Sequence, residues 1–383
     1  MERLIISVLV VCFFVPTILA QESGHKISNG TSVTNRPIRN SPPLTLTVGQ
    51  TEGDLRGRDD KVIQAGIDYL NRLGGGTLRI FPGVYLMQNA LYLGPNITLR
   101  GSGTDTVLKK APSVVTALVQ DSDWFEFGVH VENTKGFEPG SGIMLRSSTG
   151  PGGWQFDILR ATITAVKGNV LFVDRLLRNN FWIDKQSTAA TIFPLITADY
   201  ADDVRIEDLI LDGNRDQNAY VNGIFSGAVF IYGCHRWRFR NVIARNYNGD
   251  GFSFHVSDDI QFNHCQALNN ADIGFHAGSG SQRPVLRNCV AQGNSLGLFF
   301  CWGVSDGHVE DCVMRENRRY GVSIGHRDTD NVIRDCLIER NGQVGILFRQ
   351  EANIFKSGHR NRIENCLILD NGGPQGGVGI EIQ

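Results

Sequence analysis

The stretch that decides the fold is "VIRDCLIERN", residues 332–341, in which a cysteine is followed five residues later by an asparagine. The same frame recurs in "QFNHCQALNN", "PVLRNCVAQGN", "GHVEDCVMREN" and "NRIENCLILDN". With Leu209 and Asn241 counted in the cysteine phase, the asparagine is present at seven positions: Asn214, Asn246, Asn270, Asn294, Asn317, Asn341 and Asn371. From 241 to 336 the spacing is 24, 24, 23 and 24 residues, with intervals of 32 and 30 on either side. A period in the twenties is typical of a solenoid.

Each asparagine is followed by a glycine that begins an alternating run. The runs are "GFSFH" from 251, "GFHAG" from 274, "GLFFC" from 297, "GVSIG" from 321 and "GILFR" from 345. Alternation with period 2 predicts a strand, with the first and third residues after glycine inward and the second and fourth outward. The dense leucine pattern of a leucine-rich horseshoe is absent. Each repeat is therefore predicted to form one coil of a parallel β-solenoid.

Stacking of the coils predicts two columns of like side chains, because neighbouring strands lie ~4.8 Å apart. Cys265, Cys289, Cys312, Cys336 and Cys366 are expected to point inward as a reduced stack. Secretion would favour disulfides, but seven cysteines remain after a leader is removed, and one rung slightly exceeds the ~3.5–4.5 Å between Cβ atoms that a disulfide needs. The asparagines are predicted to tolerate left-handed backbone in a turn and to hydrogen-bond from coil to coil.

The coils and the block "GDLRGRDDKVIQAGIDYLNRLGGGTLRIFPGVYLMQNALYLGPNITLRGSG" resemble the right-handed parallel β-helix proteins of the pectate lyase superfamily. The resemblance covers roughly residues 45 to 383 and implies an all-β, right-handed parallel β-helix with an N-terminal helical cap. In the block, Val62, Ile63, Ile67 and Leu70 fall on one helical face that ends at Gly74-Gly75-Gly76. Residues 46–383 are expected to form one β-helix domain.

The N-terminus and the charge indicate where the protein works. Residues 4 to 20, "LIISVLVVCFFVPTILA", are predicted to be a signal peptide (1–20), followed by a flexible lead-in (21–45). The retained-anchor alternative would need all 17 apolar residues to span a membrane. We expect a secreted, periplasmic or cell-surface protein with no membrane contact after cleavage. The net charge of −2 gives no global attraction to nucleic acid.

Two further regions depart from the repeat. Residues 112–198 contain strand-like runs such as "ATITAVKGNVLFVDRLL" and predict irregular coils or an inserted β subdomain, in which the sequence indicates no chemistry. At the other end, "GVGIEIQ" leaves an open strand edge without a polar cap. That edge predicts either a homo-oligomer through the C-terminal coil or a local plug.

Candidate site residues lie where the glycine strands point outward, since each coil presents equivalent positions there. The outward or strand-end residues are Asp250, Ser253, His255, Asp272, His276, Phe299, Cys301, Trp302, Ser323, His326, Arg327, Asp328, Leu347, Arg349, Gln350 and Glu351. His255 and His276 are expected about 8 Å apart. That separation suits two groups flanking a sugar better than two ligands of one metal ion, although surface histidines bonded across rungs are equally expected.

A long turn, residues 214 to 227, precedes the strand before the one that carries His255. Long turns often carry function, so Arg215, Asp216 and Tyr220 are expected to overhang the groove near Asp250, unless they form a solvated loop. Farther along, Arg327 and Glu351 share a phase and are expected to pair. Arg349, ~19 Å from His255, is expected to bind a distant carboxylate of a polymer.

Three functions fit these residues, and the first is a polysaccharide lyase or C5-epimerase acting on an acidic, uronate-containing polymer. Proton abstraction beside a carboxylate needs a base and a cation. His255 or His276 is predicted to be the base, the other or Tyr220 the acid, and Arg327 and Arg349 the carboxylate partners, with His326 close by. Asp250 orients a base or, with Asp272, binds Ca²⁺, which the resemblance offers as an alternative cation.

The other two functions use the same face differently. A glycoside hydrolase needs two carboxylates about 5–9.5 Å apart, which Asp250 offers with Asp272 or Asp216. However, the Asn-Thr-Asp, Asp-Asp and Gly-His-Gly motifs of similar polygalacturonases do not occur in that order in this sequence. A non-catalytic carbohydrate-binding solenoid would use Phe299 and Trp302 as stacking platforms and Gln350 as a polar contact. Fold alone does not decide among the three.

Overall fold

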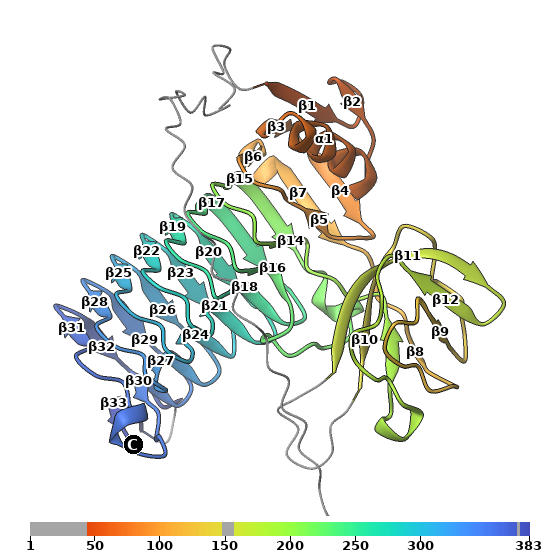
Figure 1. The fold of residues 1–383 in the computed structure, drawn as a ribbon. Coiled ribbons are helices and arrows are strands. Elements are labelled where there is room, and N and C mark those ends of the chain that lie inside the picture. The colour runs from red at the N-terminus through yellow and green to blue at the C-terminus, as the bar shows by residue number, and fades with distance from the viewer. Residues whose placement is uncertain (1–43, 148–156, 374–375) are drawn as a thin grey trace, which may run out of the picture. The chain divides into compact units, whose positions relative to one another are not determined.

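Short strands stack coil on coil in a computed structural model that describes residues 44–147, 157–373 and 376–383 (Figure 1). The described elements belong to one compact unit, Pro43–Gln383. The predicted signal peptide (1–20) and residues 21–43 of the predicted lead-in lie outside the described residues. Within the described ranges, no helix has the length and apolar character needed to cross a membrane.

Three ladders of parallel strands run along the stack, and β15 and β17 span the first two. The first ladder consists of β1 (Thr45–Gly49), β3 (Gly76–Ile80), β6 (Ile97–Arg100), β15 (Arg205–Asp212), β17 (Arg238–Arg245), β19 (Gln261–Asn263), β22 (Val285–Arg287), β25 (His308–Glu310), β28 (Val332–Arg334) and β31 (Arg362–Glu364), with β2 (Leu55–Arg56) beside β1. The second adds β4 (Gly83–Met87), β7 (Thr106–Lys110), β20 (Gln266–Leu268), β23 (Val290–Gln292), β26 (Val313–Arg315), β29 (Leu337–Glu339) and β32 (Leu367–Leu369).

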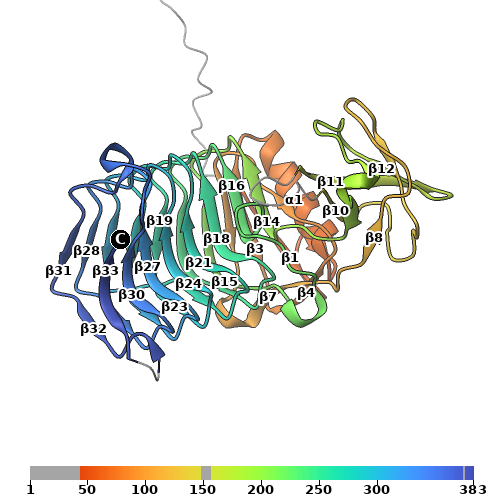
Figure 2. The same ribbon diagram turned by 90° about the horizontal axis from the view of Figure 1, so that it is seen from below.

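The third ladder is formed by the glycine strands. In spatial order it runs β5 (Leu91–Tyr92), β14 (Ile196–Asp199), β16 (Gly227–Tyr232), β18 (Asp250–His255), β21 (Ile273–Ala277), β24 (Leu296–Phe300), β27 (Tyr320–Ile324), β30 (Val344–Phe348) and β33 (Val378–Ile382). Single turns of 3₁₀ helix lie at η1 (Gly103–Asp105), η2 (Ile183–Lys185), η3 (Arg215–Gln217) and η4 (Ile354–Lys356). Figure 2 shows these coils in register behind one another.

The inward columns are as the repeat predicts. Phe252, Phe254 and Phe275 of the third ladder lie in the core, as do the alanines of the second ladder. The five repeat cysteines are free thiols, and the Cys289 amide donates to the Cys312 sulfur at 3.4 Å. The predicted reduced stack is therefore confirmed.

The asparagine ladder joins the coils, but it has five members and not seven. The Asn270 amide nitrogen donates to the Asn294 Oδ1 at 3.0 Å, and the pattern repeats through Asn317 and Asn341 to Asn371. Asn214 and Asn246 lie outside it. The predicted left-handed backbone occurs one residue earlier in these five turns, for example at Asn269 (φ 56°), because the ladder side chains must point into the coil.

The N-terminal helix α1 (Asp60–Arg72) packs against the first strands of the solenoid. Asp59 caps it by accepting a hydrogen bond from the Val62 amide, and Ile63, Ile67 and Leu70 are buried. After the helix, Gly74, Gly75 and Gly76 all have positive φ, so the chain turns where other residues would be strained. The predicted helical face and its glycine stop are confirmed.

The described residues within 115–147 and 157–190 form an inserted antiparallel sheet, here called the insert. Its order is β8 (Val115–Ala117), β13 (Thr188–Ala190), β10 (Gly142–Arg146), β11 (Ile158–Lys167), β12 (Val170–Val173) and β9 (Gly128–His130). It has a small core of its own. In Figure 1 it lies beside β14 and β16.

At the far end of the stack, β33 pairs with β30 along one edge. Among the described residues nothing pairs with its other edge, and Ile380 and Ile382 are exposed. The open edge is as predicted, whereas association through it stays a prediction.

Replacing Asn317 by alanine tests the ladder. Its Oδ1 accepts from the Asn294 backbone and side chain, and its own amide donates to Ala291 and Asn341. Because these groups are buried and would lose their partners, we expect unfolding free energy to fall by about 2–5 kcal/mol in denaturant titrations. The exposed Asn263, whose side chain hydrogen-bonds to the adjacent His264, is the control: Asn263→Ala should change stability little. Equal effects would contradict the ladder's role.

Candidate functional site

The in-register third ladder places one column of outward side chains on neighbouring coils. Phe230, Ser253, His276, Phe299 and Ser323 are successive Cα partners. The predicted outward orientation is thus correct, but this face is not open: Ser253 and His276 are buried there. The covering groups include the long turn 214–227, since Ser253 donates to the Gly223 carbonyl.

A buried carboxylate–imidazole pair lies at the start of this face. Asp250 begins β18, and its Oδ2 lies 2.7 Å from the His276 Nδ1 while its Oδ1 accepts from the Ile273 amide at 2.9 Å. Both side chains are fully buried. Gly223 packs so closely on the Asp250 carboxylate that no Cβ would fit there. The second ring nitrogen of His276, Nε2, has no nitrogen or oxygen hydrogen-bond partner in the described part of the chain.

The pair holds a proton on His276. Burial alone would lower the pKa of His276, but the Asp250 carboxylate and its hydrogen bond raise that pKa to about 10. Burial also raises the pKa of Asp250 to about 6, against the opposing effect of His276. Near neutral pH the pair is therefore an imidazolium facing a carboxylate. An imidazolium donates from both nitrogens, and a side-chain hydrogen bond with Cys301 adds to the effect of Asp250 in raising the pKa of His276.

His255 is in the opposite state. Its ring centre is 5.0 Å from that of His276 and roughly perpendicular to it, and the side chain is 6% exposed. Burial, together with the positive charges of His276 and Arg160, lowers the pKa of His255 well below its usual value. Its Nε2 lies 3.0 Å from the Ser253 hydroxyl. The two rings are closer than the predicted 8 Å because that figure follows the backbone, whereas the side chains lean together.

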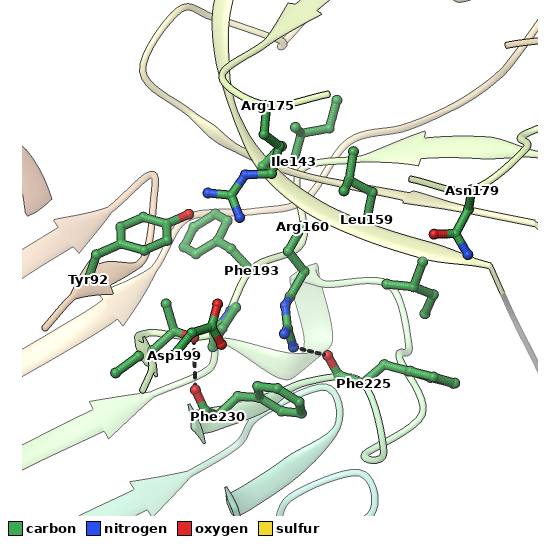
Figure 3. Close-up of a pocket in the computed structure, with 15 residues that line it drawn as sticks. Tyr92, Ile143, Leu159, Arg160, Arg175, Asn179, Phe193, Asp199, Phe225 and Phe230 are labelled. Atoms are coloured by element: carbon green, nitrogen blue, oxygen red, sulfur yellow. Dashed lines mark hydrogen bonds between the residues drawn. The ribbon is translucent and has the colours of Figure 1, made fainter. Parts of the chain in front are cut away.

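A cavity of about 340 Å³ lies between the insert and the third ladder, and His255 is next to one of its lining residues, Phe230. The Phe230 ring forms part of its wall and is 5.3 Å from the His255 ring. The other lining residues include Tyr92, Arg160, Arg175, Asn179, Phe193, Asp199 and Phe225. In Figure 3 the two guanidinium groups, the Tyr92 hydroxyl and the Asp199 carboxylate face one another across the cavity.

Arg160 is a second cation, after His276, whose charge lowers the pKa of His255. Its Nη1 donates to the Phe225 carbonyl at 2.8 Å, and its Cζ lies 3.9 Å from the centre of the Phe230 ring. Burial lowers the pKa of Arg160, yet no described carboxylate forms an ion pair with it. A continuous series of contacts therefore runs from Arg160 through Phe230 and His255 to His276.

Two predicted residues of the later coils are engaged within the protein. Arg349 donates to the Ser323 hydroxyl, the Phe300 carbonyl and the buried Asp328 carboxylate, the last at 3.1 Å. Its guanidinium also lies 4.4 Å from the Phe299 ring. The prediction that Arg349 binds a substrate carboxylate is not supported, because Asp328 already occupies it.

The neighbouring predicted residues lie at the exposed rim. Glu351 pairs with the His326 Nδ1 at 2.8 Å, so the predicted Arg327–Glu351 pair is wrong. Arg327 is exposed and left-handed (φ 59°), which points its side chain away from that column. Trp302 is 58% exposed, with its ring 5.1 Å from His326. Gln350 is also exposed.

The long turn reaches the groove through Tyr220. Its hydroxyl lies 3.4 Å from the Asp272 Oδ2, which also accepts from the Gly223 amide. Burial, with Asp272 and Asp250 nearby, raises the pKa of Tyr220 to about 12. Arg215 instead donates to the Asn269 carbonyl over the asparagine turn, and Asp216 is exposed. Of the three predicted turn residues, the structure brings only Tyr220 toward Asp250 and Asp272.

The residues present do not fit the predicted Ca²⁺ site. Both Asp250 oxygens accept hydrogen bonds from the protein, and two carboxylates are few for a cation that takes six to eight oxygens. Within residues 44–147, 157–373 and 376–383, no group of three or more His, Cys, Asp or Glu is arranged to hold a metal ion.

Comparison with known proteins identifies the fold. The model of the right-handed β-helix region matches residues 209–356. The A-module of mannuronan C-5 epimerase AlgE4 from Azotobacter vinelandii aligns with a TM-score of 0.51 and 19% identity over 85% of this chain and 78% of that chain. The chain folds as a right-handed parallel β-helix. The predicted fold class is confirmed.

Other structures align with this β-helix less well. The A-module of AlgE6 from the same organism gives 0.49 and 16% identity over 84% and 75% of the two chains. A hyperthermoactive exopolygalacturonase from Thermotoga maritima gives 0.38 and 12% over 87% and 94%. No curated protein matches the sequence. Likeness at these identities concerns the fold alone.

Sequence reasoning missed the cavity of this β-helix because half of it comes from the insert. Alternation in β11 buries Leu159, Ala161 and Ile163 in the insert core and places Arg160 on the opposite face. The alternation in β11 can be seen in the sequence. The packing of this face against the solenoid depends on tertiary structure, which the alternation does not give. Tyr92 and Asp199 were missed because they precede the regular repeats.

The two histidines can be distinguished by nuclear magnetic resonance titration of their ring signals. We expect His276 to stay protonated until the pH approaches about 10 and His255 to stay neutral well below pH 6.5, because only His276 has a carboxylate partner. In Asp250→Asn the alkaline titration should disappear, at a stability cost of about 3–5 kcal/mol for the broken buried pair. Asp216→Asn, in the exposed turn, is the control. Two histidines titrating together near pH 6.5 would contradict this assignment.

Proposed function

We propose that this β-helix protein is a polysaccharide lyase or C5-epimerase that removes a proton beside the carboxylate of an acidic, uronate-containing polymer. One observation carries the proposal: two neighbouring histidines have pKa values displaced in opposite directions, and only the Phe230 ring separates His255 from a cavity that contains Arg160. Paired titratable groups whose pKa values are pushed apart are the usual arrangement for acid and base roles. The structural likeness to epimerases does not itself assign the reaction.

Each group has a role that follows from its state. His255 is the base, because it is neutral and retains some exposure, whereas His276 is fully enclosed. Arg160 is the cation that stabilises charge developing on the substrate carboxylate, which is the main requirement of this reaction. His276 is buried away from the substrate, so its positive charge acts at a distance, by disfavouring protonation of His255 and by stabilising the negative charge that develops on the substrate. Asp250 positions His276 and keeps it charged.

A glycoside hydrolase is less well supported. Its acid and its nucleophile or base need carboxyl groups that reach the sugar, but Asp250 is buried with both oxygens engaged. Asp272 accepts from the Gly223 amide and Tyr220. Asp216 is exposed on the long turn.

A non-catalytic carbohydrate-binding function is favoured by one observation, the exposed Trp302 beside His326 at the rim. Indole and imidazole rings are suitable stacking surfaces for sugars. This function does not explain why an imidazolium is kept buried beside a neutral imidazole, so we rank it below the enzyme.

We further propose that the protein acts outside the cytoplasm on this polymer. The support is the apolar segment 4–20 followed by a polar stretch. N-terminal sequencing of protein recovered from the culture medium or periplasm should begin near Gln21. Recovery of the uncleaved chain in membranes would contradict secretion.

Proton abstraction is tested in D₂O with pectate, alginate, glycosaminoglycan and ulvan-type polymers. We expect either ultraviolet absorbance from an unsaturated uronate, for a lyase, or deuterium at C5 of the polymer, for an epimerase. His255→Gln should lower the rate by about 10²–10⁴-fold, while His308→Gln, an exposed histidine on another ladder, should not.

The expected pH profile follows from the two states. Because His255 must be neutral, activity should persist below pH 6.5, and because His276 must be charged, it should fall as the pH approaches about 10. New reducing ends without deuterium or absorbance would move the assignment to a hydrolase. Binding with no turnover on every polymer would favour the binding function.

A further inference from the structure

The cavity lies at the end of the third ladder. Its floor is formed by residues of β16, β14 and β5, and β5 is the last strand of that sheet. The opposite wall comes from the insert, through Ile143 of β10 and Arg160 of β11. Groups on the outward face of the coils therefore meet the insert where the face itself ends.

The two arginines of the cavity differ in their partners. Arg175 is held by Asp174 at 3.2 Å, so its charge is matched. Arg160 makes one hydrogen bond, to the Phe225 carbonyl, and one ring contact, to Phe230. A guanidinium has five N–H donors, so several remain for a ligand. Arg160 is partly buried, and Asp199, the exposed carboxylate across the cavity, opposes the effect of burial on the pKa of Arg160 without forming an ion pair among the described residues.

We propose that this cavity is the subsite for the terminal acidic sugar of the polymer, with the sugar carboxylate bound by Arg160. The inference rests on the proposed function for the identity of the polymer. A planar guanidinium matches a carboxylate in a two-bond fork. Phe193, Phe225 and Phe230 supply apolar wall for a sugar ring, and Tyr92 and Asp199 supply partners for its hydroxyl groups.

The position of the cavity requires a chain end and not the middle of a chain. A polymer whose end sugar occupies the cavity leaves it past the Phe230 ring, toward His255, which is 6% exposed. Among the described strands none continues this face beyond β5, and the insert forms the opposite wall of the cavity. The sugar in the cavity is therefore the last one, and the bond that reacts is near His255. The enzyme accordingly acts from one end of its substrate.

Binding is measured by calorimetry on the whole protein with acidic trisaccharides from the polymers above. The matched ligands are the same trisaccharides with their carboxyl groups reduced to alcohols, and a sulfated trisaccharide. We expect only the carboxylate forms to bind, and Arg160→Gln to weaken them at least about 10-fold, as for a lost charged contact. Arg178→Gln, an exposed arginine of the insert, is the control and should bind normally.

Arg160→Lys keeps the charge but not the two-bond fork. Its affinity for the carboxylate trisaccharides should lie between those of the wild type and Arg160→Gln. Thermal unfolding shows whether Arg160→Gln is folded, and Arg160→Lys is the more conservative second variant if it is not. Equal binding of the reduced trisaccharides, preference for the sulfated one, or unchanged binding in a folded Arg160→Gln would overturn the assignment.

Chain-end action is measured separately, by the size of early products and by viscosity. We expect small acidic products, or modified sugars confined to one end, while viscosity stays high. A rapid fall in viscosity, or modification spread through the chain, would overturn it. His255→Gln should keep trisaccharide affinity and lose turnover. Binding without turnover in the wild type would therefore refute the proposed function while leaving the cavity assignment standing.

Discussion

The structure depends on one constraint, the register in which successive coils stack. Buried asparagine amides fix it, because each donates to the next and accepts from the previous one at the same turn. In a strand with period 2, a slip of one residue would exchange the two faces. His276 would then enter the core and Phe275 would face outward. The ladder thus determines which side chains meet on the outer face as well as holding the coils together.

Those parts of the fold that repeat could be predicted from the sequence, for a physical reason. A residue such as Cys312 or Asn317 has the same neighbours in the coil above and below, so its environment follows from the spacing alone. The direction of Ser253 and His276 follows in the same way. The helix α1 was predictable because its burial pattern and glycine stop are local in sequence.

The features that create chemistry are the ones that break the repeat. Asp250, at the start of β18, contacts His276, in the middle of β21. The equivalent positions of the other coils carry different residues. Arg349 is held by Asp328, which folds back from the end of a neighbouring coil. Spacing places such residues on a face but does not say which of them meet. The covering of the face is also non-local, since Gly223 and Arg160 come from a long turn and from the insert.

The charges along the outer face explain why Arg160 is the residue on it that would bind an anion. Ring and cation contacts run from Arg160 through Phe230, His255, His276 and Phe299 to Arg349. Two of the three cations in this series have a buried carboxylate: Asp250 for His276 and Asp328 for Arg349. Arg160 has none. Its charge, which Asp199 opposes without an ion pair, also disfavours protonation of His255, and a bound carboxylate would relieve that effect. Substrate binding would therefore raise the proton affinity of the base at the moment it is needed.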